Sequence, residues 1–392
     1  MAVLLSSAAL QSQQIDLPLL GRSPLNIYSA MTFVLDRGSV LTDGISGTRN
    51  RLVRVDLERG GVTEYFEIHR FLGAVGDRVL VSTVDREHIL KLRFVDPQSL
   101  DIKGAPGWTF PVDWGLVQGP GGTLYSARLD SRGTYTPYRF NPQEQGQFWL
   151  DIEGVPTSMT GDALHLLIHN PDSGEIFIWS TEKRAVRSRL RSSDPTGQVR
   201  FLTNSVVLLP PQYTGQESWR LYNLEGTEVA AVTFRISGVD PLFFWFTPDL
   251  RRAVVCIRGR VNPETAVVNT EDFRRWLVRE GHLFVPTRGV LNDSRVRVRA
   301  HPTLDAEILG HLDRGDRVEV LERSGLEESI GAMSDFWYRI RTEDGLTGWS
   351  YGHFIDLQLT FSIWSIAVRA SAATRTGPWS GRKSSCAWRR PD

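Results

Sequence analysis

A two-residue marker recurs between residues 55 and 269 of this 392-residue chain, at intervals of 39 to 46 residues. In each marker a hydrophobic residue is followed by Asp, Asn or Ser, and a polar turn with another strand-like run comes next. The six markers are Val55-Asp56, Val95-Asp96, Phe140-Asn141, Trp179-Ser180, Tyr222-Asn223 and Val268-Asn269. Repeats of this length are typical of four-stranded units that pack only on their neighbours.

A second turn marker keeps the same period and lies one hairpin earlier in each unit. It consists of Arg37-Gly38, Gly76-Asp77, Gly121-Gly122, Gly161-Asp162, Thr203-Asn204 and Pro248-Asp249. Between the two markers lie runs such as RVLVSTVD, ALHLLIHN and RAVVCIRG, which are rich in β-branched and aliphatic residues. We therefore predict an all-β chain in which residues 30–285 form a β-propeller of about six blades.

In architecture this region resembles the propellers of the WD-repeat and quinoprotein-like class, although no blade carries their full sequence signatures. A seventh blade formed partly from residues 15–30 stays open, and so does a large β-sandwich or a pair of them. Residues 271–280 place Phe273, Trp276 and Leu277 at helical spacing, but the same stretch also fits the outer strand of a blade.

Residues 290–357 alternate with a period of two, as half-buried strands do. Val296, Val298 and Ala300 alternate with Arg295, Arg297 and Arg299. The turn signals that separate the runs are Asn292-Asp293, Asp313-Arg314-Gly315, Asp344-Gly345 and Gly348. Five short strands within about 65 residues predict a small β-barrel, which we assign to residues 286–357.

The barrel segment resembles a bacterial SH3 (SH3b) domain. The family's opening strand, Leu-Asn-Val-Arg-Ser-Gly-Pro, falls on residues 296–302, although Arg297 replaces the usual Asn and His301 the usual Gly. The other matching positions are Ile308, Leu309, Gly310, Leu312, Gly315, Val318, Val320, Trp337, Tyr338, Ile340, Gly345, Gly348, Trp349, Phe354 and Ile355. The connection from Gly325 to Asp335 is longer than the family needs, and we expect it to be a surface-loop insertion.

The resemblance implies a non-catalytic module that binds peptidoglycan or an envelope protein or peptide. Aromatic side chains are the candidate ligand contacts. We expect Trp337 and Trp349 to serve mainly as barrel core, because so small a barrel has little other apolar volume. Tyr338, Tyr351 and His353 are the better candidates for a binding groove, since amphipathic rings at strand ends can stay half exposed.

Composition points to no other class of ligand. Lys plus Arg equals Asp plus Glu at 45 each, so no overall field favours nucleic acid as a partner. Two cysteines are too few for a disulfide framework, and Cys256 lies in an apolar run that predicts a buried thiol. We expect no cofactor, no bound metal and no membrane span, and a monomer.

No catalytic motif stands out, since Gly-x-Ser-x-Gly, His-Glu-x-x-His and Cys-x-x-Cys are all absent from the sequence. His165 and His169 lie four apart, but in a strand-like run, so a metal site is not the favoured interpretation. A carboxylate pair from Asp77, Asp113, Asp162 or Asp249 would suit a glycoside hydrolase, yet Asp in turns is usually structural. The same holds for aromatic residues near the blade entries, Trp108, Trp114, Phe243, Phe244 and Trp245, which normally form core.

The two ends differ in composition from the rest. Residues 1–29 begin MAVLLSSAALQSQQ, which resembles the distal part of a secretory signal without its basic start. Residues 358–392 carry six basic residues against Asp392 alone, and predict a disordered basic tail. We therefore expect an exported, non-enzymatic protein of the periplasm or cell envelope, with a wall-active hydrolase as the alternative.

Overall fold

The computed structural model describes most of the chain between residues 12 and 358. The described ranges are 12–23, 26–27, 33–35, 38–46, 49–84, 90–106, 116–119, 122–142, 146–192, 199–211, 218–239, 241–258 and 264–358. The N-terminal residues 1–11 and the basic segment 359–392 lie outside the described residues, and so do Asp113, Trp108, Trp114 and Cys386. The described part is built almost entirely of strands, with one α-helix.

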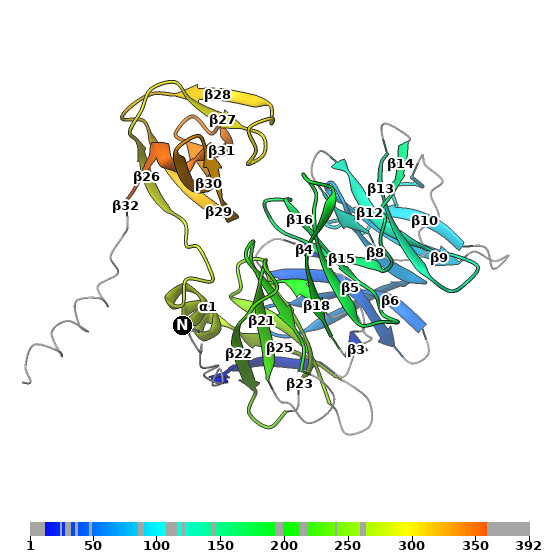
Figure 1. The fold of residues 1–392 in the computed structure, drawn as a ribbon. Helices are drawn as coiled ribbons and strands as arrows, with labels where there is room; N and C mark the ends of the chain where they lie inside the picture. The colour runs from blue at the N-terminus through cyan, green and yellow to red at the C-terminus, as the bar shows by residue number, and fades with distance from the viewer. Residues whose placement is uncertain are drawn as a thin grey trace, which may run out of the picture.

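Six separate sheets follow one another along the chain, which confirms the predicted propeller (Figure 1). The first three blades contain β3 (Asn26–Ile27), β4 (Phe33–Leu35), β5 (Ser39–Ser46), β6 (Arg49–Asp56) and β7 (Val62–Glu67); then β8 (Arg70–Val75), β9 (Arg78–Val84) and β10 (Leu90–Val95); then β11 (Val117–Gln118), β12 (Leu124–Leu129), β13 (Tyr135–Asn141) and β14 (Gly146–Trp149). In each blade, neighbouring strands are antiparallel.

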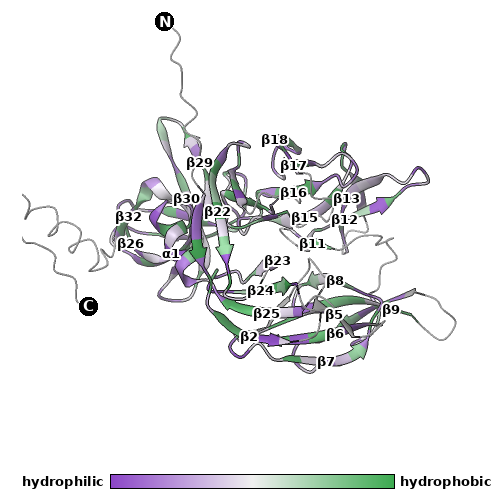
Figure 2. Ribbon diagram, turned by 90° about the horizontal axis from the view of Figure 1, so that it is seen from below, coloured by the Kyte–Doolittle hydropathy of each residue, from purple (hydrophilic) through white to green (hydrophobic). Residues whose placement is uncertain are grey.

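The last three blades have the same order. They contain β15 (Val155–Met159), β16 (His165–His169), β17 (Glu175–Ser180) and β18 (Ala185–Arg191); then β19 (Arg200–Phe201), β20 (Val206–Leu209), β21 (Trp219–Asn223) and β22 (Glu228–Arg235); then β23 (Pro241–Phe246), β24 (Arg252–Ile257) and β25 (Glu264–Asn269). Figure 2 shows the sheets around a common centre, near which β8, β11, β15 and β23 lie.

Hydrogen bonding explains why Asp, Asn or Ser ends the same strand of most blades. Asp56 Oδ1 accepts the backbone N–H groups of Glu58 and Arg59, at 2.8 and 2.9 Å. Asn223 Oδ1 accepts those of Glu225 and Thr227, at 3.1 and 2.8 Å. A short polar side chain here turns the backbone towards the last strand of the blade, so the sequence marker is an Asx turn.

The N-terminal segment closes the ring. Strand β2 (Leu19–Ser23) pairs with β25 and supplies the outer strand of the sixth blade, while β1 (Gln13–Asp16) adds to the fifth blade parallel to β22. Ile15 and Leu17 are buried in the core shared by these two blades. Residues before position 30 are therefore part of the sheets, and they complete the sixth blade of the described ring instead of starting a seventh.

The ambiguous stretch after β25 is a helix, α1 (Glu271–Arg279). The outer-strand alternative is wrong because β2 already occupies that edge of the blade. Phe273, Trp276 and Leu277 are buried against the fifth and sixth blades, which is the face their spacing predicts. Within the described residues, no helix is long and apolar enough to cross a membrane.

Side chains that pack between adjacent sheets form the propeller core, as predicted for Phe244 and Trp245, which are both buried. Strand residues alternate between apolar and polar along much of Figure 2. Cys256 on β24 is also buried, and burial raises the pKa of its thiol to about 11. This side chain is therefore structural, as the apolar run around it indicates.

The segment after α1 forms one curled sheet with its own core, which confirms the predicted barrel. Its elements are β26 (Thr287–Leu291), β27 (Val296–Arg299), β28 (Ile308–Leu312), β29 (Arg317–Ile330), β30 (Met333–Thr342), β31 (Thr347–Tyr351), the 3-10 turn η2 (Gly352–Phe354) and β32 (Ile355–Gln358). The alternation predicted for the first strand ends at Arg299. A register shift between Val298 and Arg299 turns that side chain inwards, where its guanidinium donates to the Ala306 carbonyl at 2.8 Å.

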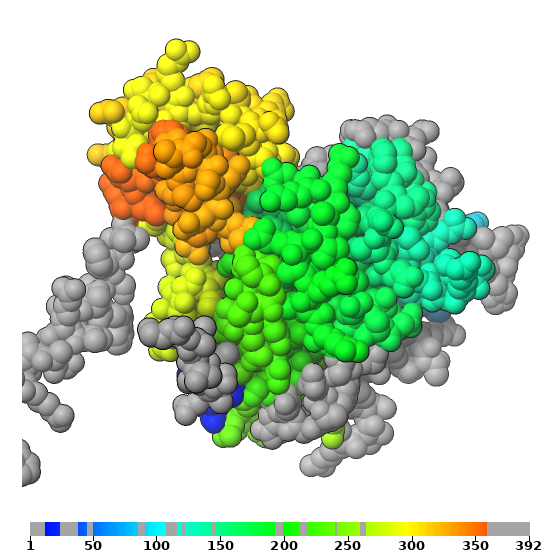
Figure 3. All heavy atoms as spheres, in the orientation of Figure 1, coloured from blue at the N-terminus to red at the C-terminus, as the bar shows by residue number. Residues whose placement is uncertain are grey.

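The expected surface loop from Gly325 to Asp335 is instead part of a long hairpin. Strands β29 and β30 continue pairing out to Ile330 and Met333, past the body of the barrel. The surface-loop expectation is wrong because this extension has partners on both sides. It covers aromatic side chains of the barrel, and it contacts the fourth and fifth blades of the propeller (Figure 3).

Candidate functional site

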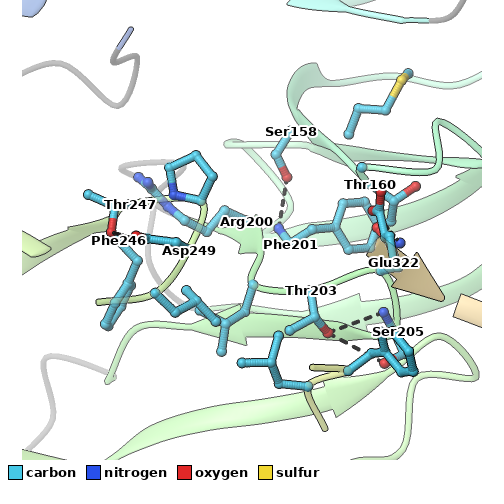
Figure 4. Close-up of a pocket in the computed structure, with 18 of the residues that line it drawn as sticks. Ser158, Thr160, Arg200, Phe201, Thr203, Ser205, Phe246, Thr247, Asp249 and Glu322 are labelled. Atoms are coloured by element: carbon cyan, nitrogen blue, oxygen red, sulfur yellow. Dashed lines mark hydrogen bonds between the residues drawn. The ribbon is translucent and has the colours of Figure 1, made fainter. Parts of the chain in front are cut away.

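A cavity of about 980 Å³ lies at the centre of the propeller, on the side that faces the barrel (Figure 4). Its walls are the innermost strands of blades two to six, namely β8, β11, β15, β19 and β23, with the turns that follow the last three. The linker 282–286 and residues 321–324 of the barrel hairpin complete the lining. Both domains therefore contribute to this one cavity.

A hydrogen-bonded contact holds the hairpin at the edge of the cavity. The Asn204 side-chain amide donates to Glu322 Oε1 at 2.7 Å and to the Arg323 carbonyl at 2.9 Å. The Asn204 Oδ1 atom accepts the backbone N–H of Asp162 at 3.3 Å. Asp162 Oδ2 in turn accepts the Gly325 N–H at 3.0 Å. We call these four hydrogen bonds the docking contact.

Asp162 is the buried carboxylate of the docking contact. Burial raises the pKa of its side chain, and nearby Glu322 acts in the same direction, while hydrogen bonds from Thr160, Leu164 and Gly325 oppose the shift. The turn role predicted for Asp162 accounts for its bond to the Leu164 N–H at 3.1 Å. The second oxygen is used by the barrel, so this Asp joins two domains as well as shaping a turn.

Arginine dominates the charge of the cavity lining. Five arginines line it against two carboxylates, an excess of three positive charges in a chain whose formal net charge is zero: Arg200, Arg251, Arg274, Arg323 and Arg339, with Asp249 and Glu322. A cavity with one sign of charge and low-dielectric walls concentrates ions of the opposite sign.

Four of the five arginines are engaged by protein groups. Arg339 pairs with Glu322 at 3.6 Å, and Arg323 lies 4.3 Å from the centre of the Phe336 ring. Arg274 and Arg251 pair with Glu271, at 3.3 and 3.9 Å. Their positive charges are therefore at least partly balanced within the protein.

Arg200 differs from the other four. It lies on β19, half-buried, and its guanidinium makes no hydrogen bond or ion pair with any residue that the structure describes. Burial lowers the pKa of Arg200 to about 10, so the side chain is a cation at neutral pH. Figure 4 shows it in the cavity between Ser158 and Thr247.

The two carboxylates of the lining are held by other groups. Asp249 Oδ1 accepts from the Thr247 hydroxyl at 2.6 Å and from the Arg251 N–H at 3.1 Å, as a turn residue does. Glu322 belongs to the docking contact. In Figure 4 they lie on opposite sides of the cavity, and they come from different domains. This lining suits the binding of an anion better than acid–base attack by a carboxylate pair.

The barrel aromatic residues form a separate, covered cluster. Trp337, Trp349 and Tyr351 are buried together beneath the hairpin extension. The Trp337 indole donates to a Glu328 side-chain oxygen, and the Tyr351 hydroxyl donates to the Glu328 carbonyl at 2.6 Å. The core role predicted for both tryptophans is confirmed by their burial, and the extension adds a cover that their sequence positions do not reveal.

The three residues predicted to form the binding groove are not equally accessible. Tyr338 is buried in the main barrel core, where its ring lies 5.6 Å from that of Phe284. Tyr351 is buried in the covered cluster. His353 is exposed, so of the five predicted binding residues it alone meets the access that a ligand contact requires.

The remaining sequence candidates lie apart from this cavity. Asp77 is an exposed turn residue, and its side chain is 93% accessible. His165 and His169 stand at the two ends of β16, both buried. In the described ranges no three His, Cys, Asp or Glu side chains gather as a metal-binding group. Sequence reasoning overlooked Arg200, although an arginine between Val199 and Phe201 in an innermost strand is an available signal.

Comparison with known proteins identifies one part of the chain. Residues 294–356 match the family model described as bacterial SH3 domain. No curated protein matches the chain. Solved structures similar to it include TolB from Acinetobacter baumannii, with a TM-score of 0.44, 11% identity and coverage of 60% of this chain and 63% of that chain.

Two further solved structures are similar at the same level. An oligogalacturonate lyase in complex with manganese has a TM-score of 0.39 and 12% identity, and the match covers 64% of this chain and 90% of the other. The Dos1 propeller has a TM-score of 0.34 and 11% identity, with coverage of 62% and 68%. The chain spans less than two thirds of the length of the TolB chain.

Proposed function

We propose that this protein is an exported, non-enzymatic binding protein of the bacterial cell envelope. The barrel recognises peptidoglycan or an envelope peptide, and the propeller provides a second interaction surface. The observation that carries the proposal is the match of residues 294–356 to the bacterial SH3 domain, because such domains are typically extracellular or envelope-associated.

The packing of the two domains supports a joint role. The hairpin extension holds the barrel on the propeller through the docking contact, so a ligand of the barrel is presented at a fixed position relative to the central cavity. The barrel also keeps apolar side chains exposed on β28, where Ile308 and Leu309 are each 42% accessible. Exposed apolar groups beside polar ones are common in surfaces that bind peptides or sugars.

Sedimentation with purified peptidoglycan tests the proposal. The full chain should sediment with peptidoglycan and stay in solution with cellulose, a neutral polysaccharide of similar texture. The Ile308→Ser and Leu309→Ser double variant should sediment less. Val84→Ser, at an exposed position on the propeller, should not change the sedimented fraction.

Two results would count against the proposal. If the full chain stays in solution with peptidoglycan, the barrel does not recognise the wall. If soluble wall fragments appear on incubation, the protein acts as a hydrolase instead of a binder.

A further inference from the structure

We propose that the central cavity binds a small anionic ligand whose carboxylate or phosphate group pairs with Arg200. This inference goes beyond recognition of the wall by the barrel, because it assigns a ligand to the cavity of the propeller. The shared chemistry is an oxyanion group carried on a polar molecule or on the end of a short peptide.

The state of Arg200 is the first argument. A half-buried cation without a protein partner loses part of its hydration and gains no ion pair in return. The guanidinium also presents its N–H donors in a planar fork, which fits the two oxygens of a carboxylate or phosphate. Among the five arginines of the lining, this side chain alone has neither a carboxylate nor an aromatic ring to engage it in the described structure.

The surrounding charge is the second argument. The lining holds three more arginines than carboxylates, and both carboxylates already accept hydrogen bonds from protein groups. An incoming anion therefore meets a positive field with little competition from Asp249 or Glu322. Because the chain as a whole has no net charge, this field is a local property of the cavity.

Hydroxyl groups near Arg200 are the third argument. Ser158 Oγ accepts the Phe201 N–H at 2.8 Å, which leaves the hydroxyl hydrogen free to donate. Thr203 and Ser205 lie on the same wall, with their hydroxyl oxygens 3.4 Å apart (Figure 4). Neutral donors beside an arginine can bind the remaining oxygens of an anion and polar groups of the molecule that carries it.

The size of the cavity limits the ligand. A volume of about 980 Å³ lies near the upper end of the range of roughly 300–1,000 Å³ for small-molecule sites. An inorganic ion would fill little of this space, so we expect a larger molecule with the anionic group at the Arg200 end. Since the barrel hairpin lines the same cavity, the bound ligand should also stabilise the docked barrel.

Calorimetric titration of the full chain tests the inference with three probes. Inorganic phosphate represents phosphate ligands, the dipeptide Ala-Glu represents carboxylates, and the uncharged Ala-Gln amide is the control without an anionic side chain or terminus. We expect phosphate or Ala-Glu to bind with a Kd in the millimolar range or below, and at least about tenfold more tightly than the amide. The stronger of the two identifies the oxyanion.

Arg200→Gln should weaken the stronger probe at least about tenfold, because it removes the charge and the fork. Arg200→Lys keeps the charge and should fall between the two, and it serves as the test if Arg200→Gln does not fold. Arg187→Gln is the matched control, since Arg187 pairs with Glu225 at 2.9 Å outside the cavity. The inference is overturned if neither anion binds, or if both Arg200 variants bind like the unchanged chain.

Discussion

Replacing Asn204 by Ala should release the barrel hairpin from the propeller. The substitution removes three of the four hydrogen bonds of the docking contact and leaves the fourth, from Gly325 N–H to Asp162, without support. A hydrogen bond to a charged group contributes about 1.5–3 kcal/mol and a neutral one about 1 kcal/mol. Allowing for water that replaces some of them, the docked state should lose about 3 kcal/mol.

Hydrogen exchange at the Gly325 amide measures this loss directly. The amide is protected in the docked state because it donates to the buried Asp162 carboxylate. A loss of about 3 kcal/mol corresponds to roughly 100-fold faster exchange if local undocking limits the rate. Amides in the middle of β20 and β21 should keep their protection, which would show that the propeller is still folded.

Asn223→Ala is the matched control for this experiment. Asn223 belongs to the same blade as Asn204, and its side chain accepts two backbone N–H groups within its own turn. Its loss should weaken the blade locally and leave exchange at Gly325 unchanged. Equal exchange at Gly325 in the unchanged chain and in Asn204→Ala would refute the docking contact.

Three further predictions concern the stability of the fold. Burial lowers the pKa of His165 to about 4; because the unfolded chain then takes up its proton first, up to about 3 kcal/mol of stability should be lost as pH falls from about 6.5 to 4, and His165→Leu should lack that part of the pH dependence in denaturant unfolding. Leu17→Ala should cost about 3 kcal/mol if the N-terminal strands close the ring, whereas Leu19→Ala, at a position 38% exposed, should cost little; equal effects of the two would contradict the closure. Gly325→Ala should undock the barrel, because a Cβ atom there would lie 2.1 Å from the Asn204 carbonyl oxygen, while Gly61→Ala meets open space and should leave small-angle scattering unchanged.

The architecture could be predicted from sequence because its signals are local. Each blade ends the same strand with a residue such as Asp56 or Asn223, whose side chain makes its hydrogen bonds within four residues. The barrel could be predicted for the same reason, since its alternation and turns lie within one short segment. Such patterns depend on neighbouring residues and not on distant contacts.

The candidate site could be predicted only in part, because it depends on contacts between distant residues. The choice between helix and strand for residues 271–279 is decided by β2, which is more than 240 residues away in the chain. The burial of Tyr351 follows from the hairpin extension, whose length is visible in the sequence but whose direction is not. Arg200 stands out only once the positions of carboxylates from six blades and the barrel are known.

The central claim is that this protein acts by binding to the cell envelope, and a binding isotherm on purified peptidoglycan tests it most directly. Increasing amounts of the full chain are incubated with a fixed amount of wall, and both the sedimented protein and the wall material in the supernatant are measured. The account predicts saturable sedimentation and no time-dependent release of wall fragments. Absence of sedimentation, or steady release of fragments, would contradict it.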